Sequence, residues 1–484
     1  MIMTKTAFTL IPLLALLGAC SHTGSPDRGI VPPPDWQSPT AATAHATDLE
    51  HWWTSFNSPQ LAQLVDQARR GSYDLKAATA RVRQAAADVR IAGGAQLPRL
   101  DGSANAYRQR LLKGQGYSEL DTSSNERTYH YFDTALTASY EIDFWGRNAA
   151  TRDSARHSLQ ASELDRDTLA LSLSGQVADT YLAALAAREQ TRIATLNLSN
   201  AQRILEVVRA RYRAGSATAL ELAQQQSLVA GQQRLLPLYR QQAQDALITL
   251  ATLLGEPVQR LQLAPLPFEQ LQGPAIDAGI PSQLLTRRPD IAGAEARLAA
   301  AQADVRVARA ALFPSLTLTA SLATGDRQGA DLLRNPVLNL GAGLTAPIFN
   351  NGQLRAERDK ASARQQELLE TYRGVLVTSF GEVEKALNSI DGLDRQTRWQ
   401  QEELQQAQRA FDLAQSRYRA GAEDLLSVLQ AQSSLFSAQA ERVQLRKDRL
   451  LASVALYKAL GGGWTTQPTV VGAGLGRDAD NAGL

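Results

Sequence analysis

The chain has 484 residues, and its 50 Lys and Arg residues almost balance its 48 Asp and Glu residues, which leaves a net charge of +2 at pH 7. The sequence contains no basic block, so its charge pattern excludes a nucleic-acid-binding protein. It has a single cysteine, so an intrachain disulfide is excluded and stability must come from packing.

The N-terminus has the pattern of a secretory signal peptide, which we predict for residues 1–19. A lysine precedes an apolar stretch over residues 7–17, which is too short to span a bilayer as a helix. The stretch ends in Leu17-Gly18-Ala19-Cys20, which resembles a bacterial lipobox, so we expect a covalent lipid on Cys20. The alternative is a buried or incidental cysteine. Ser21 follows instead of Asp, which in lipoproteins of this kind implies sorting to the outer membrane.

Residues 20–47 are rich in Pro, Ser, Thr and Ala and include Pro32-Pro33-Pro34. Such a composition favours an extended chain over a packed domain. We therefore predict a lipidated, proline-rich tether that spaces the lipid from the body of the protein.

Helical periodicity and helix-forming residues cover most of the remaining chain. We predict helices over residues 58–92, 148–213, 217–254, 281–312, 352–419 and 423–460. Two of these stretches have about 65 residues, which corresponds to a length of about 100 Å at a rise of about 1.5 Å per residue. Such long helices need lateral partners, and near-heptad leucines such as Leu222 and Leu228 favour coiled-coil packing.

Segments with period-two alternation lie between the helices, near residues 99–112, 128–144, 315–323 and 337–349. In the second segment Leu136 and Tyr140 share one face, and Asp133 and Glu141 lie on the opposite face. Strands of about ten residues with one apolar face fit the lipid-out, polar-in alternation of a membrane barrel. A soluble sandwich is the alternative. Phe144, Trp145 and Phe349 at strand ends favour the membrane, because they match an interfacial aromatic girdle.

Four strands are too few for a closed barrel, since the smallest outer-membrane barrels have about eight. Their edges must therefore pair between subunits. Three chains would supply about twelve strands around an aqueous lumen, continued by a tube of helices. The sequence thus predicts a mixed α and β fold: a homotrimer with a membrane β-barrel of four strands per chain and a long periplasmic α-helical barrel.

The sequence is also an internal duplication. Arg211-Tyr212-Arg213-Ala214-Gly215 recurs at residues 417–421, a shift of 206 positions, and Leu254-Gly255 recurs as Leu460-Gly461 at the same shift. We predict one body of two structural repeats, residues 48–260 and 261–464, followed by a C-terminal tail over residues 465–484.

Together these features resemble the TolC-like outer-membrane efflux channels, in particular the acylated branch that includes OprM and the NodT-type lipoproteins. Further motifs carry the resemblance, namely Leu97-Pro98, Phe313-Pro314, the segment 143–147 and the segment 347–352. The resemblance implies a passive trimeric duct for drugs or other small molecules. An inner-membrane pump would deliver them through a periplasmic adaptor protein. Alternatives are a protein or peptide exit duct and a non-channel coiled-coil lipoprotein scaffold.

Motifs of catalytic chemistry are absent from the sequence, which contains no Walker loop, no His-Glu-x-x-His and no Gly-x-Ser-x-Gly. We therefore expect no enzyme and no cofactor apart from the lipid on Cys20. Met1 and Met3 both lie in the predicted signal peptide, and the His residues are scattered, so we also expect no metal site.

The predicted gate lies at the two repeated turns, where Gly215 and Gly421 permit a tight reversal between helices. The resemblance implies that these turns meet the adaptor and that nearby residues close the pore. Glu221 and Tyr418 match the family's polar contacts, but Glu423 stands where an Arg is expected, and Ser427 and Gln430 stand where Asp residues are expected.

Leu426 matches an apolar constriction, so we predict a gate closed more by apolar contact than by an aspartate ring. The alternative is that all of these are ordinary surface and seam residues at a helix turn.

The lipobox makes a direct prediction. Cys20→Ala removes the acyl acceptor, so the variant should accumulate as an uncleaved precursor without lipid. Labelled palmitate fed to the expressing cells should enter the wild-type protein and be absent from the variant. Normal incorporation into the variant would refute the lipobox.

Overall fold

The structure is a computed structural model that describes residues 29–39, 49–110 and 128–464. Contacts divide the chain into two units, residues 1–31 and 32–484, and the second unit holds all the elements described below. The predicted signal peptide, Cys20 and the predicted tail over residues 465–484 lie outside the described residues.

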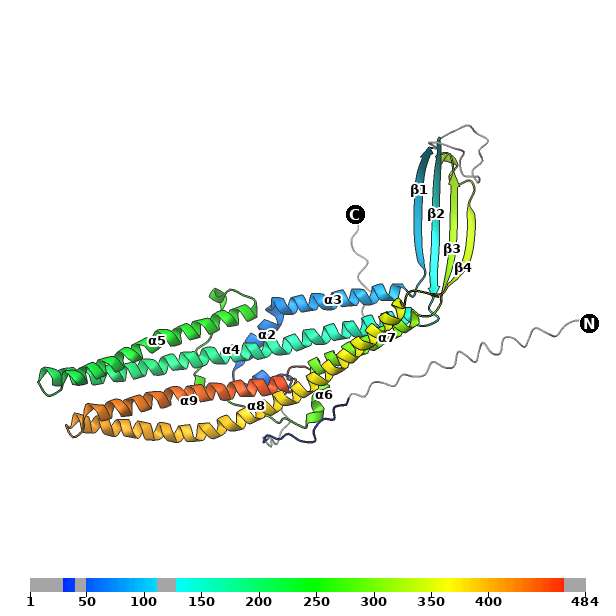
Figure 1. The fold of residues 1–484 in the computed structure, drawn as a ribbon. Helices are drawn as coiled ribbons and strands as arrows, with labels where there is room; N and C mark the ends of the chain where they lie inside the picture. The colour runs from blue at the N-terminus through cyan, green and yellow to red at the C-terminus, as the bar shows by residue number, and fades with distance from the viewer. Residues whose placement is uncertain (1–28, 40–48, 111–127, 465–484) are drawn as a thin grey trace, which may run out of the picture. The chain divides into compact units, whose positions relative to one another are not determined.

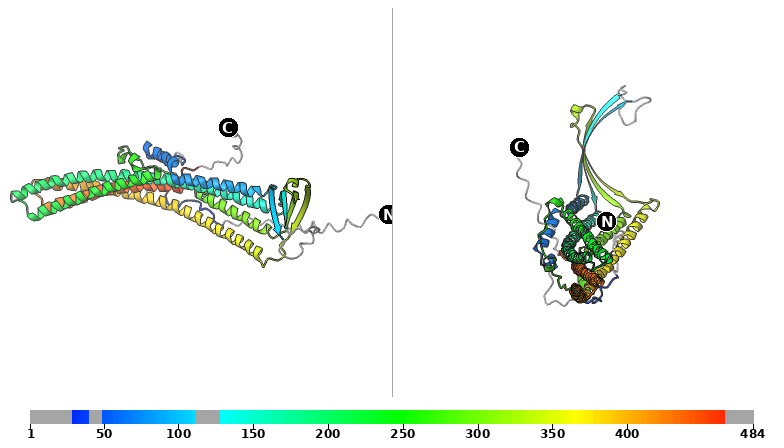
Figure 2. Two further views of the ribbon diagram at one scale, coloured as in Figure 1. Left: turned by 90° about the horizontal axis from the view of Figure 1, so that it is seen from above. Right: turned by 90° about the vertical axis from the view of Figure 1, so that its left-hand side faces the viewer.

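Two helical hairpins dominate this unit. Helix α4 (Arg147–Arg213) and helix α8 (Gln353–Arg419) have 67 residues each, so each is about 100 Å long. Each turns back into a shorter helix, α5 (Ala219–Leu254) after α4 and α9 (Leu425–Ala459) after α8. The four helices lie side by side in the order α5, α4, α9, α8 (Figures 1 and 2).

An apolar seam joins the two hairpins near their turns, because α4 packs along α9. Its buried side chains on these two helices, which we call the α4–α9 seam, are Ala201, Ile204, Leu205, Val208, Leu425, Val428, Leu435 and Phe436. Val229 of α5 and the α8 residues Phe411 and Tyr418 complete the same buried cluster. Burying such side chains stabilises the pair by about 1.5–3 kcal/mol for each large one.

The remaining helices depart from the predicted bounds. They are α2 (Pro59–Gly71), α3 (Tyr73–Gly94), α6 (Leu284–Arg287) and α7 (Pro289–Ala310). In the part of the chain that the structure describes, five short 3-10 turns cover Trp52–Phe56, Val258–Arg260, Phe268–Gln270, Pro281–Gln283 and Gly329–Asp331.

The helix predicted over residues 58–92 is broken at Ser72, whose ψ of 126° is not helical. The end of α2 abuts the end of α5 there, and a Cβ on Gly71 would lie 2.3 Å from the Leu254 carbonyl oxygen. The helix predicted over residues 281–312 is interrupted in a similar way. Arg288 has an extended conformation because Pro289 follows it, and α7 starts at that proline.

The strands form one antiparallel sheet in the order β1 (Arg99–Arg110), β2 (Thr128–Ile142), β3 (Ser315–Asp326) and β4 (Val337–Thr345). The outer strands β1 and β4 are therefore its two edges, and the sheet is curved (Figure 2).

Three predicted strand ends were wrong. Strand β3 continues to Asp326, because β2 extends far enough to pair with it. Strand β4 stops at Thr345, since Pro347 has no N–H for a ladder. Strand β2 stops at Ile142, because the main chain turns there: the Phe144 N–H donates to the Ile142 carbonyl at 2.8 Å. The Asp143 carboxylate then accepts hydrogen bonds from the N–H groups of Asn148 and Ala149 in the first turn of α4, at 3.0 and 2.8 Å. Residues 111 and 112 of the predicted first strand lie outside the described residues.

Part of the predicted tether is bound to the body of the protein. The Trp36 indole donates a hydrogen bond of 2.8 Å to the Gly279 carbonyl. The main-chain N–H groups of Gln37 and Ser38 donate to the Glu384 carboxylate of α8, and these bonds lower the pKa of Glu384 against the opposing effect of burial. The tether therefore contacts the helices before it reaches the first repeat.

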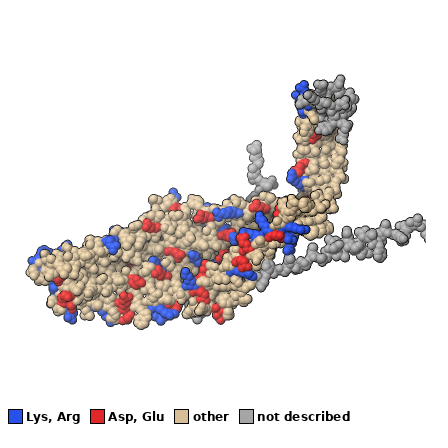
Figure 3. All heavy atoms as spheres, in the orientation of Figure 1, with Lys and Arg blue, Asp and Glu red and all other residues tan. Residues whose placement is uncertain are grey.

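Among the described residues, none of the helices has the length and apolarity of a membrane span. Acidic and basic side chains are interspersed over the face of the helices in Figure 3, with no large patch of one sign. This pattern agrees with the near-neutral charge of the sequence.

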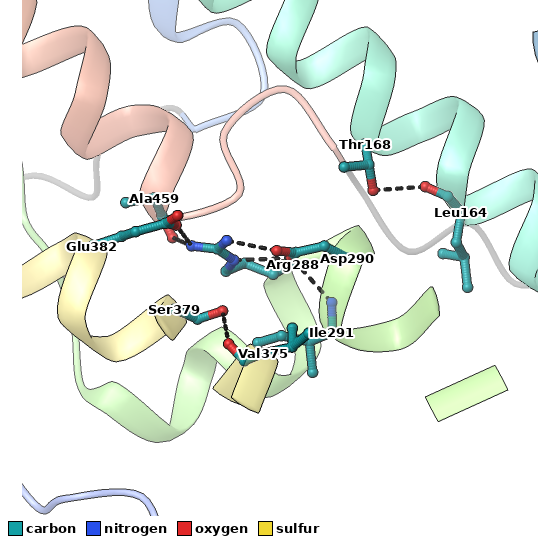
Figure 4. A network of polar contacts seen from close by, with 9 residues as sticks. All are labelled: Leu164, Thr168, Arg288, Asp290, Ile291, Val375, Ser379, Glu382 and Ala459. Atoms are coloured by element: carbon teal, nitrogen blue, oxygen red, sulfur yellow. Dashed lines mark hydrogen bonds and ion pairs between the residues drawn. The ribbon is translucent and has the colours of Figure 1, made fainter. Parts of the chain in front are cut away.

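A buried arginine ties α7 to the second hairpin (Figure 4). Arg288 donates to Asp290 at 2.6 and 3.0 Å, to Glu382 of α8 at 2.7 Å and to the Ala459 carbonyl of α9 at 3.0 Å. Burial by itself lowers the pKa of Arg288, but the two carboxylates outweigh it, so the pKa is raised and the guanidinium stays charged.

Arg288→Ala should destabilise the protein by about 2 kcal/mol. Removing one partner of a fully buried pair costs about 3–5 kcal/mol, but here both carboxylates keep contact with water. Thermal unfolding of the detergent-solubilised protein measures the change. Arg297→Ala, which removes a partner from the exposed pair with Asp165, is the matched control and should cost much less. Equal effects of the two substitutions would contradict this role of Arg288.

Candidate functional site

The predicted gate residues lie at the two hairpin turns, which the duplication builds in the same way. After α4, the Gly215 N–H donates to the Tyr212 carbonyl at 3.0 Å, and the Ser216 N–H donates to the Arg211 carbonyl at 2.9 Å. After α8, the equivalent bonds run from Gly421 and Ala422, with the same two lengths.

Both turns require glycine for the same reason. Gly215 has a φ of 72° and Gly421 a φ of 79°, a left-handed conformation that costs other residues free energy. These bonds satisfy carbonyl groups that the helix ends would otherwise leave unpaired. The turns are therefore held by the main chain and leave their side chains available for contacts.

The start of α5 is a capping box made by Thr218 and Glu221. The Glu221 N–H donates to the Thr218 hydroxyl at 3.2 Å, and the Thr218 N–H donates to the Glu221 carboxylate at 2.6 Å. The predicted gate residue Glu221 is thus hydrogen-bonded within its own turn.

At the start of α9 the Asp424 carboxylate accepts a hydrogen bond of 2.9 Å from the Ser427 N–H, and this bond lowers the pKa of Asp424. The Ser427 hydroxyl donates to Glu423 at 3.0 Å, and the Glu423 carboxylate lies 3.3 Å from Arg417 Nε. Glu423, which replaces an expected Arg, is therefore the acceptor of a local network around the second turn.

The two hairpins meet through Arg211 and Tyr418. Arg211 Nη2 donates to the Tyr418 carbonyl at 2.6 Å and more weakly to the Arg419 carbonyl at 3.4 Å. The guanidinium also lies over the Tyr418 ring, 4.3 Å from its centroid, in cation–π geometry. Tyr418 is only 3% exposed, and burial raises the pKa of its phenol while Arg211 opposes the rise.

The Tyr418 hydroxyl itself is buried, and no hydrogen bond of ordinary geometry reaches it from the described residues, although Arg211 lies close enough to lower its pKa. Arg211 therefore holds the second turn by its carbonyl group and its ring. We call this contact the Arg211–Tyr418 latch.

Of the predicted gate residues, Tyr418, Glu221 and Ser427 lie at the turns. Tyr418 accepts a hydrogen bond from Arg211, Glu221 is bonded to Thr218, and Ser427 is bonded to Asp424 and Glu423. Leu426 is 51% exposed, whereas its neighbour Leu425 is 1% exposed and belongs to the α4–α9 seam. Gln430 is also exposed. In this chain neither Leu426 nor Gln430 takes part in the contact between the hairpins, so both are free to face another subunit or a lumen.

Sequence reasoning missed Arg211. It belongs to the duplicated Arg-Tyr-Arg-Ala-Gly motif, so the repeat pointed to the right segment. The glycines and Tyr418 of the motif were predicted to have roles at the turns, but Arg211 was not. The contact itself depends on the packing of α4 against α9, which brings the two turns together.

A large groove of about 1510 Å³ lies farther from the turns, lined by α4, α8, α9 and residues 268–273. Its walls carry the ion pairs Glu189–Arg192, Glu269–Arg442 and Asp394–Arg449, with N–O distances of 2.6, 3.0 and 2.6 Å. Among the described residues, no cluster of His, Cys, Asp and Glu could hold a metal ion. The pair Glu189–Arg192 lies within α4, whereas Glu269–Arg442 joins the linker to α9 and Asp394–Arg449 joins α8 to α9.

Comparisons with known proteins agree with this architecture. A relative described as the pyoverdine export outer membrane protein OpmQ of Pseudomonas aeruginosa is 58% identical over 463 residues, which cover 96% of this chain and 98% of that protein. The solvent efflux pump outer membrane protein SrpC of Pseudomonas putida is 31% identical over 481 residues, which cover 95% of this chain and 99% of that protein.

A solved structure of the open state of the Neisseria gonorrhoeae MtrE outer membrane channel matches with a TM-score of 0.81 and 27% identity. The match covers 92% of this chain and 98% of that one. The family model described as outer membrane efflux protein matches residues 64–256 and 280–462, one segment in each repeat. The chain therefore belongs to the outer membrane efflux protein family.

Proposed function

We propose that three copies of this chain form a lipid-anchored exit duct, which receives its cargo from an inner-membrane pump through a periplasmic adaptor. The observation that carries the proposal is the four-stranded sheet with two free edges, attached to two hairpins of equal build. In a bilayer every main-chain polar group needs a partner, so β1 and β4 must pair with other strands.

Three curved sheets supply twelve strands, which suffice for a closed barrel around an aqueous lumen. Apolar side chains on the edge strand β4 are strongly exposed in the single chain, with Leu338 at 65%, Leu340 at 76% and Leu344 at 72%. Contact with lipid would remove this surface from water. The shared family and the exposed edges together support a trimer over a soluble sandwich.

We infer that the duct closes at the hairpin turns. The Arg211–Tyr418 latch holds the second turn to the first within each chain. Leu426 and Gln430 remain exposed near the second turn, where three chains would bring three copies of each together. A ring of leucines excludes water from a narrow opening, and neutral glutamines would line it without attracting ions.

The cargo that we propose is a pyoverdine-type siderophore. The support is the 58% identity to a protein named for pyoverdine export, over nearly the whole of both chains. Relatives named for solvent and toluene efflux are only about half as similar, at 31% identity. A passive duct needs no catalytic group, and we propose that the chain is not an enzyme. The alternative functions are a duct for protein export and a coiled-coil scaffold without a channel, and the measurements below distinguish them from a siderophore duct.

Leu426→Asp should open the duct. Three carboxylates in one constriction repel each other and hold water, so the resting conductance in planar bilayers should rise. Gln430→Asp should instead raise cation selectivity and sensitivity to block by multivalent cations, because clustered carboxylates bind them. If Leu426→Asp leaves the conductance unchanged and Gln430→Asp leaves the ion selectivity unchanged, the aperture lies elsewhere along the helical tube.

Arg211→Ala should also favour the open state. A hydrogen bond from a charged donor contributes about 1.5–3 kcal/mol, so its loss should shift the equilibrium between closed and open states toward the open state by about tenfold to a hundredfold. Single-channel recordings measure the open fraction. Arg213→Ala, which removes the same charge from the same turn, is the matched control and should behave as wild type. If Arg211→Ala has the same open fraction as the wild-type protein, the Arg211–Tyr418 latch has no role in closing the duct.

Deletion of the gene from a siderophore-producing host should leave pyoverdine in the periplasm, and the wild-type gene should restore its release. Fluorescence of medium and periplasmic fractions measures both. A protein that conducts in bilayers but leaves siderophore release unaffected would be a duct for another cargo. A protein that never conducts would be a scaffold.

A further inference from the structure

The two faces of the four-stranded sheet differ in chemistry. Residues directly opposite each other on neighbouring strands lie on the same face, so the register assigns each position to one face. A row across one face consists of Leu100, Ala138, Ala320 and Leu340. The adjacent row, on the other face, consists of Asp101, Thr137, Ser321 and Asn339. The first face, which we call the apolar face, is therefore the one suited to contact with lipid.

The apolar face has the height of a hydrocarbon layer. On β2 it runs from Ile142, next to the helices, to Phe132. With a rise of about 3.4 Å per residue and a tilt of about 40°, this stretch spans about 26 Å along the membrane normal. The apolar band of an outer-membrane barrel is about 25 Å tall. Phe132 and its partner Ala106 on β1 thus mark the outer end of the band.

Basic side chains lie on the apolar face just beyond this end. Arg108 of β1 is opposite His130 of β2, and Arg110 is opposite Thr128, so these pairs continue the apolar rows outward. Both arginines are exposed. Figure 3 shows basic side chains at the end of the sheet that is farthest from the helices.

Arg108 and Arg110 lack a counter-ion in the described part of the chain, because neither forms an ion pair or a hydrogen bond there through its side chain. Asp326 of β3 shares the apolar face, but its carboxylate accepts a hydrogen bond of 2.9 Å from the Gln328 N–H. Three other arginines in or next to the strands each have a carboxylate, in the pairs Arg99–Asp101, Arg147–Glu141 and Arg334–Asp331, at 2.7, 2.6 and 3.1 Å. The two unpaired cations are thus those on the apolar face.

We propose that Arg108 and Arg110 bind the phosphate groups of a phosphorylated lipid in the outer leaflet, of the chemical class to which lipopolysaccharide belongs. The acyl chains of this lipid lie along the apolar face, and its phosphates lie at the height of the two guanidinium groups. This inference rests on the trimeric barrel of the proposed function, which places three such arginine pairs around its outer rim.

The spacing of the two arginines suits this ligand. Residues two apart on a strand lie about 6.8 Å from each other, so both guanidinium groups can reach one headgroup. The planar fork of a guanidinium donates two parallel hydrogen bonds to a phosphate. Without an anion between them, the two cations repel each other. Arg108 and Arg110 therefore offer charge and donors to an anion that the apolar face holds by its acyl chains.

Lipid binding to the purified full-length trimer tests the site. Native mass measurement in detergent gives the affinity for added diphosphoryl lipid A and for the same lipid with both phosphates removed. The wild-type protein should bind the diphosphoryl form at least tenfold more tightly. Arg108→Gln with Arg110→Gln should lose this preference and bind both forms with the affinity of the phosphate-free lipid.

Arg99→Gln is the matched control for Arg110→Gln, because it removes the same charge from the same strand. Arg99 lies on the polar face at the inner end of β1, so its variant should bind as wild type, whereas Arg110→Gln alone should weaken binding severalfold. A trimer that conducts but binds both lipids equally, or binds equally well with and without the two arginines, would overturn the inference and leave the duct intact. A monomeric native mass would overturn the trimer as well.

Thermal unfolding gives a second readout. Diphosphoryl lipid A should raise the unfolding midpoint of the wild-type trimer, because a ligand that binds only the folded protein stabilises it. The same lipid should leave the midpoint of the double variant unchanged. Equal rises in the two proteins would show that acyl chains alone are bound, and would overturn the phosphate site.

Discussion

The apolar seam between α4 and α9 is the contact on which the arrangement of the two hairpins depends. Each hairpin is long and thin, and its own two helices cannot bury all of their apolar side chains. The seam removes residues such as Ile204, Leu435 and Phe436 from water and brings the two turns within reach of one another. Arg211 can contact Tyr418 only because this packing aligns two helix ends that are 206 positions apart in the sequence.

The sheet resembles the helices in having uncovered outer edges. Each repeat contributes one hairpin and two strands, and each leaves apolar surface or main-chain groups without a partner at its outer edge. Inside the chain the two repeats cover each other on one side only. A duplicated unit with one covered and one uncovered side is suited to ring closure, because each further copy meets the surface that the previous copy left open.

Local departures from the expected elements have specific causes. Ser72 breaks a helix because α2 must pass the end of α5, and Pro347 ends β4 because it has no N–H. The resemblance places Glu221 and Tyr418 in one set of polar contacts, and the structure shows the Glu221 carboxylate hydrogen-bonded to Thr218, three residues away, while its charge also acts on Tyr418. A local hydrogen bond of this kind forms at little entropic cost, so it competes well against a contact across the hairpins.

The sequence by itself determined the duplication, the paired long helices, the four strands and the positions of both turns. These features follow from periodicity and from residues such as Gly215 and Gly421, whose effect on the main chain is local. Tertiary structure alone decided which helix faces which, that Leu425 rather than Leu426 is buried, and that Trp36 ties the tether to the body. Those outcomes depend on contacts between segments far apart in the chain, and a pattern of neighbouring residues carries no information about which distant side chain fills the space beside it.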